Sequence, residues 1–495
     1  MAILDRYRNV VGGLTVEAES GNWFSSTNPF TGREWAELPR CGPADAERAV
    51  EAAHAAFTSG SWPELTATQR GKLLRRLAEL IERDAEKFAA LEVRDNGKLY
   101  AEMLGQVRYM AEWYHYFGGL ADKIEGGVLP SDKPQMFSYT KREPLGVVVA
   151  ITPWNSPLLL LTWKLAPALA AGNTVVVKPS EFTSCATLEF LKLFAEAGFP
   201  AGVVNSVTGF GGEVGPSLVE HPKVAKVAFT GGDATGAHIY QQAARGIKHV
   251  TLELGGKSPN IIFADANLDD AAKGAISGIF AASGQTCIAG SRVLVERSVY
   301  DEVVERIVAI ARSARIGDPM DAGTQVGPIT TLPQREKVLS YIEIAKTEGA
   351  RCVLGGRVPA DPALAEGWFV EPTIFADVNN DMRIAREEVF GPVLSIISFE
   401  DEEDAVRIAN DTIYGLAAGV WTSNMARSIR MSDRLRAGTV WVNTYRAVSF
   451  MAPFGGYKMS GIGRESGRHA IDEYLQTKCV WINLADGVPN PFVLR

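Results

Sequence analysis

The sequence contains no long uninterrupted hydrophobic run. Its most apolar stretch, residues 157–171, is about fifteen residues long and is broken by Lys164 and Pro167, whereas a helix that crosses a bilayer needs about 20 apolar residues. Residues 1–20 mix charged and apolar side chains and lack the apolar core of a secretion signal. We therefore expect a buried helix at 157–171, no membrane partner and a cytoplasmic location.

Cysteine is scarce, with five residues in 495. Cys41, Cys185, Cys287, Cys352 and Cys479 are odd in number and lack the spacing of a metal site or a disulfide framework. Unpaired cysteines of this kind are typical of proteins in a reducing compartment. The sequence therefore predicts free thiols and no bound metal.

Concentrated basic charge is also missing. The chain has 50 basic and 58 acidic side chains, a net charge of −8, and no run of Lys and Arg that could follow a phosphate backbone. Nucleic acid is therefore not an expected partner. The content of 46% hydrophobic and 22% charged residues is typical of a globular protein, and at about 150 residues per domain its length predicts two or three domains.

Between residues 146 and 253, short apolar runs alternate with helical patterns. The runs at 146–152, 174–178, 203–207, 224–229 and 249–253 predict strands, and helices are expected at 157–171, 184–197, 213–219 and 234–244. Continuous apolar strands that alternate with helices predict a parallel sheet covered on both faces. The first 125 residues are predicted to be mostly helical, with helices at 44–57 and 69–81 and a third that runs from an N-cap at Asp84 to Glu92.

The same alternation resumes after Gly255 and predicts a second α/β domain. Its expected strands are 260–263, 292–296, 368–375, 393–399, 419–422 and 438–443, and its first helices are 268–282 and 300–312. Residues 135–143 and 475–483 instead alternate apolar and polar side chains, as exposed antiparallel strands do. Strands with unpaired edges usually need cover from another chain.

Cys287 and Glu253 are the most informative residues. Cys287 lies among small residues at 280–290, and Glu253 lies beside two glycines. A nucleophilic thiolate and a carboxylate that activates water would be two halves of one acyl chemistry, but a free cysteine is more commonly a core residue. Glu253 would end the first α/β unit and Cys287 would lie in the second, so the two would meet between domains, where ligand pockets are common.

Two glycine-rich turns are candidates for binding a phosphate. Residues 209–215 begin as Gly-x-Gly but lack the third glycine of a dinucleotide fingerprint. Residues 229–236 follow a strand and open a helix, whose N-terminal amides and dipole suit a pyrophosphate. Both could instead be ordinary strand-to-helix turns. Lys178 and Glu181 follow another strand, where the carboxylate would suit ribose hydroxyls and disfavour a 2′-phosphate, or where both side chains face solvent.

Seven motifs, in one order, resemble those of the aldehyde dehydrogenase superfamily over nearly the whole chain. They are Thr-Pro-Trp-Asn at 152–155, Lys-Pro-Ser-Glu at 178–181, Phe-Thr-Gly-Gly-Asp-Ala-Thr-Gly at 229–236, Leu-Glu-Leu-Gly-Gly-Lys-Ser-Pro at 252–259, Gly-Gln-Thr-Cys at 284–287, Glu-Glu-Val-Phe-Gly-Pro at 387–392 and Pro-Phe-Gly-Gly-Tyr-Lys-Met-Ser-Gly at 453–461. One such motif would be a weak signal, whereas seven in the family's order are specific.

The resemblance implies an α/β fold with three parts. These are a Rossmann-like NAD-binding domain at 1–124 and 145–255, a catalytic α/β domain at 256–460, and a small antiparallel β oligomerisation domain from segments 125–144 and 461–495. A homodimer or homotetramer is then expected.

The resemblance also implies the chemistry. Cys287 would attack the carbonyl of a small-molecule aldehyde, and the amide of Asn155 with the backbone N–H of Cys287 would stabilise the oxyanion. Glu253 would activate the water that hydrolyses the thioester to a carboxylic acid. In the family, a Lys links the catalytic Glu to a second Glu. Lys164 matches this Lys, but we expect Gln476 in the place of the second Glu and therefore no relay.

The implied cofactor is NAD, with NADP as the weaker alternative because of Glu181. Lys178 and Glu181 match residues near the adenosine ribose, and Glu388 with Phe390 match the pair that positions the nicotinamide riboside. The full expected set is Thr152, Pro153, Trp154, Lys178, Ser180, Glu181, Gly211, Phe229, Thr230, Gly231, Gly236, Leu254, Gly255, Glu388 and Phe390.

The expected substrate pocket comprises Ser156, Trp163, Ile288, Arg446 and Phe450. Trp163 matches an aromatic wall of the family's entry tunnel, and Ser156 stands where some relatives carry an aromatic residue, which widens the channel. Arg446 would either attract a substrate carboxylate or face solvent. Aromatic, cyclic and semialdehyde substrates all fit these residues.

Two alternatives stay open. A CoA-acylating enzyme releases its thioester to a thiol and has less need of a general base, so the presence of Glu253 argues against it. A non-catalytic protein that binds the cofactor on the same fold is opposed by the joint presence of Cys287, Asn155, Glu253 and Glu388.

Overall fold

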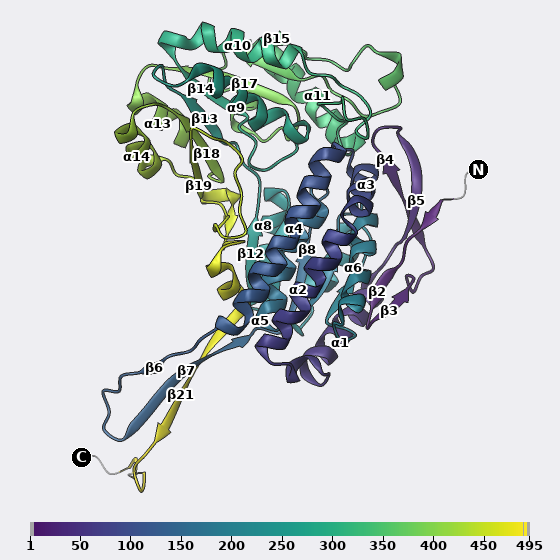
Figure 1. Cartoon of the computed structure of the whole chain (residues 1–495), viewed down its shortest axis with the longest axis vertical. Helices are drawn as coiled ribbons and strands as arrows, with labels where there is room; N and C mark the ends of the chain where they lie inside the picture. The colour runs from purple at the N-terminus through teal and green to yellow at the C-terminus, as the bar shows by residue number, and fades with distance from the viewer. Residues whose placement is uncertain (1–3, 489, 493–495) are drawn as a thin grey trace.

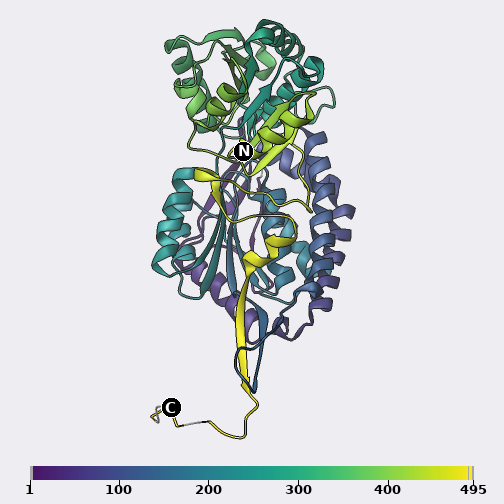
Figure 2. The ribbon, with the colours of Figure 1, turned by 90° about the vertical axis from the view of Figure 1, so that its left-hand side faces the viewer.

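The computed structural model describes residues 4–488 and 490–492. Two α/β lobes lie one above the other along the long axis, and a narrow β-hairpin projects from the lower lobe (Figure 1). The same layers are visible after a quarter turn, with helices on both sides of the lower sheet (Figure 2). Among the described residues, no helix combines the length and apolar character that a membrane span requires.

A six-stranded sheet forms the centre of the lower lobe, in the order β10-β9-β8-β11-β12-β20. The strands are β8 (Val147–Ile151), β9 (Thr174–Lys178), β10 (Val204–Ser206), β11 (Val224–Thr230), β12 (His249–Glu253) and β20 (Gly461–Ile462). The first five are parallel, and β20 runs antiparallel to β12. The predicted parallel sheet is therefore confirmed.

Helices cover both faces of this sheet, which explains its apolar strands. They are α5 (Pro157–Ala171), α6 (Cys185–Ala197), α7 (Gly211–Val219) and α8 (Asp233–Arg245). Val148 and Ala150 belong to the hydrophobic core with α5, whereas Val147 and Val149 belong to the core on the opposite face. Both sides of each strand are thus buried, as a run of apolar residues requires.

The prediction that the first 125 residues are mostly helical is wrong before residue 43. Five short strands occupy that segment: β1 (Asp5–Arg6), β2 (Asn9–Val11), β3 (Leu14–Val16), β4 (Trp23–Asn28) and β5 (Arg33–Pro39). Most of their residues are partly exposed, so they lack the apolar runs that marked the central strands.

The helices of this region are α1 (Pro43–Thr58), α2 (Ala67–Arg83), α3 (Ala85–Asn96) and α4 (Tyr100–Leu120). Asp84 occupies the predicted N-cap position of α3. Its carboxylate accepts hydrogen bonds from Arg83 instead of the helix backbone, so the position is confirmed but the side-chain cap is absent.

The upper lobe is built on a seven-stranded sheet in the order β15-β16-β17-β14-β13-β18-β19. Its strands are β13 (Pro259–Ile262), β14 (Arg292–Glu296), β15 (Arg351–Leu354), β16 (Thr373–Ala376), β17 (Val393–Phe399), β18 (Ala417–Trp421) and β19 (Thr439–Val442), and its longer helices are α9 (Leu268–Phe280), α10 (Tyr300–Arg312), α11 (Leu332–Thr347), α13 (Glu402–Asn410) and α14 (Met425–Arg434). The second α/β unit is confirmed, although β16 starts after Pro372 and not at 368.

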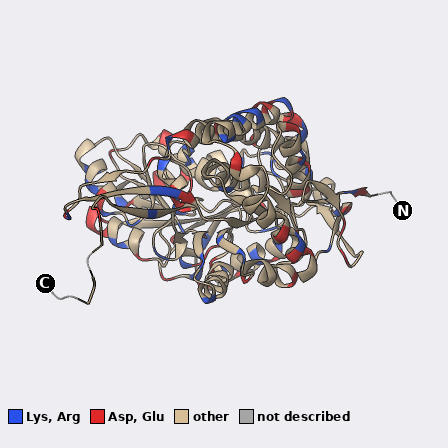
Figure 3. Ribbon diagram, turned by 90° about the horizontal axis from the view of Figure 1, so that it is seen from below, with Lys and Arg blue, Asp and Glu red and all other residues tan. Residues whose placement is uncertain are grey.

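The narrow projection is a three-stranded antiparallel sheet, which we call the hairpin sheet. Its strands are β6 (Val128–Leu129), β7 (Met136–Pro144) and β21 (Leu475–Asn483). Acidic and basic residues are interspersed on the side seen from below (Figure 3). The prediction that residues 461–474 belong to this part is wrong, because β20 pairs with β12 and η7 (Arg468–Tyr474) packs on α5. That segment therefore lies against the lower lobe.

Candidate active site

The segment that carries Cys287 begins where α9 ends. Ala282 and Ser283 adopt positive φ angles of 54° and 52°, which few non-glycine residues do and which turn the chain out of the helix. Two hydrogen bonds hold this turn: the Ala282 N–H donates to Glu102 Oε1 (3.0 Å), and Ser283 Oγ donates to the Gly327 carbonyl (2.8 Å). The turn leaves Cys287 half-buried.

The three predicted catalytic residues line one cavity of about 170 Å³. Asn155 lies just before α5, and its Nδ2 donates to the Gln285 carbonyl at 2.8 Å. Glu253 is the last residue of β12 and is 4% exposed. Its Oε1 is buried and has no hydrogen-bond partner within the part of the chain that the structure describes. A carboxyl group with an unpartnered buried oxygen thus belongs to a residue that lines the same cavity as Cys287.

Burial dominates the electrostatics of this cavity. It raises the pKa of the Cys287 thiol, and the carboxylates of Glu253 and Glu388 raise that pKa further. It also raises the pKa of Glu253 well above its usual range, with an added contribution from the Glu465 carboxylate. A carboxyl whose pKa lies nearer neutrality is a stronger base when ionised, which suits proton transfer.

The expectation that Gln476 replaces the second Glu of the relay is wrong. Lys164 Nζ donates to Thr230 Oγ1 (2.7 Å) and to Glu465, and this ion pair is almost completely buried. Gln476 is instead exposed on β21, where its amide donates to the Pro144 carbonyl. Glu465 lies in a loop without a repeating pattern, so no local signal in the sequence points to it. The structure thus provides a buried carboxylate and a buried ammonium close to Glu253.

A larger cavity of about 500 Å³ lies at the carboxyl ends of the parallel strands, where α/β sheets bind ligands. Of the expected cofactor residues, those lining it are Thr152, Pro153, Trp154, Lys178, Ser180, Glu181, Gly211, Phe229, Thr230 and Gly231. Leu254, Gly255, Glu388 and Phe390 line the smaller cavity that also holds Cys287. Gly236 lines neither cavity. It lies in the first turn of α8, where a Cβ atom would come within 2.4 Å of Leu254.

The large cavity has features that fit a dinucleotide. Lys178 is 3% exposed, with its Nζ 3.7 Å from Glu181 Oε2, so a cation and a carboxylate lie together at one wall. The helices α7 and α8 both start at its glycine-rich lining, which places N-terminal amides where a pyrophosphate would be bound.

The smaller cavity has a carboxylate that the backbone holds in place. Glu388 Oε1 accepts a hydrogen bond from the Gly256 N–H at 2.8 Å, and burial raises the pKa of Glu388 to about 7. The ring of Phe390 packs edge-on against Trp154 with 5.2 Å between centroids. The neighbouring Glu387 is paired with Arg383 outside the cavity, so Glu388 is the carboxylate of this pair that faces the site.

Several lining residues were not predicted from the sequence. They come from the loops and helices around the strand ends and include Phe182, Phe210, Thr235, His238, Gln242, Gln334 and Lys337. Gln334 also donates to the carbonyls of Val389 and Phe390 and so fixes the loop that carries Glu388. Phe182 and Phe210 lie in loops and the others on α8 and α11, and only Thr235 falls within one of the seven motifs.

The expected substrate residues lie outside both cavities. Trp163 stacks on Trp113 (6.0 Å between centroids, 21°) and contacts Phe454 (5.0 Å), and Phe450 packs on Trp113 (5.9 Å). Trp113, Trp163 and Phe450 thus form one aromatic surface, which we call the aromatic wall. Each of the other three residues takes part in a hydrogen bond. Ser156 Oγ accepts from Lys98, the backbone carbonyl of Ile288 accepts from Tyr445, and Arg446 donates to the Ser277 carbonyl.

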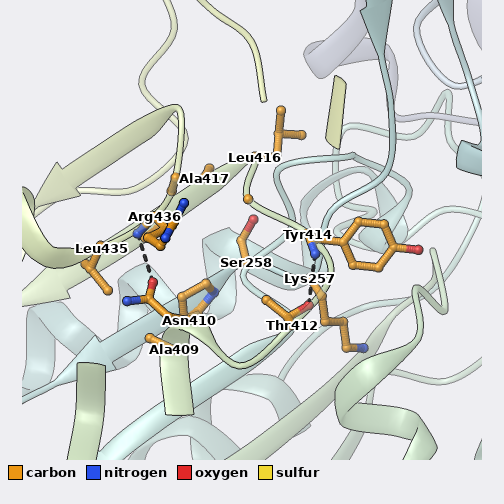
Figure 4. Close-up of a pocket in the computed structure, with 14 residues that line it drawn as sticks. Lys257, Ser258, Ala409, Asn410, Thr412, Tyr414, Leu416, Ala417, Leu435 and Arg436 are labelled. Atoms are coloured by element: carbon orange, nitrogen blue, oxygen red, sulfur yellow. Dashed lines mark hydrogen bonds between the residues drawn. The ribbon is translucent and has the colours of Figure 1, made fainter. Parts of the chain in front are cut away.

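A further small pocket lies beside Lys257 and Ser258, with Asn410 and Arg436 on its other side (Figure 4). Its volume is about 10 Å³, which is about enough for a single water molecule. Cys287 does not line it, so we place no substrate there.

The backbone at Gly256 limits how the nucleophile loop can be placed. A Cβ atom at this position would lie 2.4 Å from the Cys287 carbonyl oxygen, a distance at which the loop must shift. We expect Gly256→Ala to lower kcat/KM about 100-fold, because a shift of roughly 1 Å in a catalytic group has an effect of that size. The control is Gly105→Ala, where an added Cβ meets open space. Steady-state assays with thermal melts test this, and wild-type kcat/KM in Gly256→Ala would refute it.

Comparison with known proteins agrees with this site. The model of the aldehyde dehydrogenase family matches residues 15–480. The chain is 50% identical to (Z)-2-((N-methylformamido)methylene)-5-hydroxybutyrolactone dehydrogenase of Acinetobacter baylyi, over 95% of this chain and 96% of the relative. It is 45% identical to betaine aldehyde dehydrogenase of Bacillus subtilis, over 97% and 98% of the two chains.

Solved structures give the same result. Betaine aldehyde dehydrogenase from Staphylococcus aureus in complex with NAD+ has a TM-score of 0.97 at 41% identity, covering 99% of this chain and 97% of that one. The NAD+ complex of aldehyde dehydrogenase from Bacillus cereus has a TM-score of 0.95 at 46% identity, with 97% of both chains covered. As its motifs, fold and site indicate, the chain belongs to the aldehyde dehydrogenase family and is an oxidoreductase.

Proposed function

We propose that this protein oxidises an aldehyde to a carboxylic acid with NAD as cofactor, through covalent catalysis by Cys287 and hydrolysis assisted by Glu253. One observation supports this most: the cavity that holds Cys287, Asn155 and Glu253 shares Pro153, Trp154, Thr230, Gly231 and Gly232 with the cavity of dinucleotide size. A reacting carbon on the sulfur would then be next to the cofactor.

In the first step the Cys287 thiol loses its proton to solvent, and the sulfur bonds to the aldehyde carbon in the cavity that Glu253 also lines. The aldehyde oxygen gains negative charge. The Asn155 amide has two N–H groups, and one of them donates to the Gln285 carbonyl. The second N–H and the backbone N–H of Cys287 are left for the oxyanion.

Bound NAD supplies the hydride acceptor. The residues of this chain orient it: Lys178 and Glu181 at the adenosine ribose, the amides at the starts of α7 and α8 at the phosphates, and Glu388 with Phe390 at the nicotinamide end. The structures of the Staphylococcus aureus and Bacillus cereus relatives contain NAD+, which supports NAD for this chain.

Glu253 then takes a proton from water, which attacks the thioester carbon and releases the carboxylic acid and the Cys287 thiol. The buried Lys164–Glu465 pair lies within electrostatic range of Glu253 and offers a route for that proton. A CoA-acylating reaction would have no use for a buried carboxylate and this pair, so hydrolysis is the better-supported outcome.

Replacing Glu253 separates the formation of the thioester, which releases NADH, from its hydrolysis. Glu253→Gln should give a burst of about one NADH per active site followed by steady-state turnover about 100- to 10,000-fold below wild type, because loss of a general base has an effect of that size. The wild-type rate should rise with pH above the range in which an ordinary carboxyl ionises, because burial raises the pKa of Glu253, and the variant should lose this rise. Stopped-flow fluorescence measures both.

Cys287→Ser is the matched control for this experiment. It should bind NAD as wild type does but give no burst, since no thioester forms. Unchanged steady-state turnover in Glu253→Gln would exclude Glu253 as the deacylating base.

Glu181 should set the cofactor preference. Its carboxylate lies beside Lys178 at the adenosine wall and would repel a 2′-phosphate. We expect kcat/KM to be higher with NAD than with NADP, and Glu181→Gln to reduce this ratio about tenfold. Steady-state assays with both cofactors test it, and a wild-type preference for NADP would contradict it.

The hairpin sheet supports a homodimer or homotetramer. Val128, Trp481 and Ile482 are 70%, 52% and 42% exposed on it, and exposed apolar edge strands are usually covered by another chain. Light scattering should show a dimer or tetramer at micromolar concentration, and Trp481→Glu should lower the mass. Ile429→Glu, at an exposed apolar residue on the other lobe, should leave it unchanged. A monomeric wild-type protein would overturn this assignment.

A further inference from the structure

Lys98 is a buried cation whose side chain is hydrogen-bonded to the residue that follows Asn155. It lies between α3 and α4, is 2% exposed, and donates from Nζ to Ser156 Oγ at 2.8 Å. Ser156 directly follows Asn155, the proposed oxyanion donor. Burial lowers the pKa of Lys98 to about 8, so the ammonium form still dominates at pH 7. Lys98 forms no ion pair with any described carboxylate, and a buried charge without a close partner is costly.

Arg446 is a second cation at the same place. Its Nη1 donates to the Ser277 carbonyl at 3.2 Å, and the hydroxyl of its neighbour Tyr445 donates to the carbonyl of Ile288 at 3.0 Å. These bonds hold the loop against the residue that follows Cys287. Arg446 also has a positive φ of 68°, an unfavourable conformation for a long side chain that indicates a constrained position.

The two cations act on one another and on the reacting sulfur. Arg446 lowers the pKa of Lys98, and a Cys287 thiolate would raise the pKa values of both. Both therefore lie within electrostatic range of the nucleophile. Like Lys98, Arg446 forms no ion pair among the residues that the structure describes.

The carboxylates of Glu102 and Glu92 lie near this pair of cations, but neither forms an ion pair with them. Glu102 raises the pKa values of both Lys98 and Arg446, but its Oε1 accepts the Ala282 N–H and its Oε2 is buried without a partner. Glu92 also acts on Lys98, although burial raises the pKa of Glu92 to about 7 and so removes part of its charge. Among the described residues neither carboxylate forms an ion pair with Lys98 or Arg446, so no direct contact neutralises the two cations.

We propose that Lys98 and Arg446 form an anion subsite, and that the preferred substrates are aldehydes that carry a carboxylate. This inference rests on the proposed function. The substrate carboxylate would accept from the Arg446 guanidinium, whose planar donors match a carboxylate, and the Lys98 ammonium would add attraction. The aromatic wall of Trp113, Trp163 and Phe450 would pack on the carbons between carboxylate and aldehyde.

The aromatic wall alone suits another class of substrate, because aromatic cages also bind quaternary ammonium groups. The two cations favour the anion over that class. A positively charged substrate would be brought toward two like charges in a poorly solvated site, and such repulsion discriminates strongly between ligands.

Three probe aldehydes test the proposal with the wild-type enzyme and saturating NAD. They are 4-oxobutanoate, its neutral methyl ester, and trimethylammonioacetaldehyde. We expect kcat/KM to be at least tenfold higher for 4-oxobutanoate than for the ester, and lowest for the cation. Equal values for acid and ester, or a preference for the cation, would overturn the subsite.

Variants of Arg446 test whether its charge causes the preference for 4-oxobutanoate over the methyl ester. Arg446→Gln keeps a donor for the Ser277 carbonyl but removes the charge, and it should raise KM for 4-oxobutanoate about 10- to 100-fold while kcat/KM for the methyl ester changes less than about threefold. Arg446→Lys should recover part of the loss. An equal loss with both substrates would mean that Arg446 only supports the loop, and would refute its role in binding.

Glu102→Gln gives a change in the opposite direction. It removes the competing negative charge but keeps an acceptor for the Ala282 N–H, so KM for 4-oxobutanoate should fall while that for the ester stays constant. An unchanged or higher KM for 4-oxobutanoate would contradict the proposed charge balance.

A failure of the anion subsite can be distinguished from a failure of the proposed function, on which it rests. If no probe is oxidised, the function fails, and calorimetric titration of 4-oxobutanoate into Cys287→Ser then tests the subsite without chemistry. Binding that weakens at least tenfold when Arg446→Gln is added would support the subsite, whereas equal affinity in both proteins would refute it.

Discussion

The close approach of the Gly256 backbone to the Cys287 carbonyl is the contact on which the site depends. Residues 254–258 cross from β12 of the lower sheet to β13 of the upper one, so this contact joins the two lobes at the nucleophile. The same crossing is tied to Glu388 through the Gly256 N–H and to Ser460 through the Gly255 carbonyl. One short segment thus fixes the nucleophile and the cofactor carboxylate relative to Glu253, which ends β12.

Burial of this crossing determines the chemistry of the charged groups around it. Glu253 and the Lys164–Glu465 pair are removed from water together, and charges in such an environment interact more strongly than at the surface. The ammonium of Lys164 favours the ionised form of Glu253, whereas burial and the Glu465 charge favour its protonated form. Burial is the largest of these effects, so the pKa of Glu253 lies well above its usual range.

Strands were predicted most accurately from the sequence where both of their faces are buried. The strands β8 and β9 were located to within about a residue because all of their side chains are buried, whereas β4, with residues mostly at partial exposure, was missed. Cys287, Asn155 and Glu253 were located through motifs. Glu465 was not, because its role comes from a contact with Lys164 across 301 positions. Gly236 carries a motif position but serves the packing of α8 against Leu254.

The substrate side shows why specificity was the least predictable part. Lys98 and Ser156 come from different loops and belong to no expected pair, yet a hydrogen bond joins them beside Asn155. A small side chain at 156 is what gives the Lys98 ammonium a hydroxyl partner at that place, and an aromatic residue there would cover it. The aromatic wall restricts the shape of a substrate but not its charge, because aromatic surfaces accept neutral chains and cations alike. In the proposed anion subsite the sign of the charge would be set by Lys98 and Arg446, and these two side chains would then select among aldehydes of similar shape.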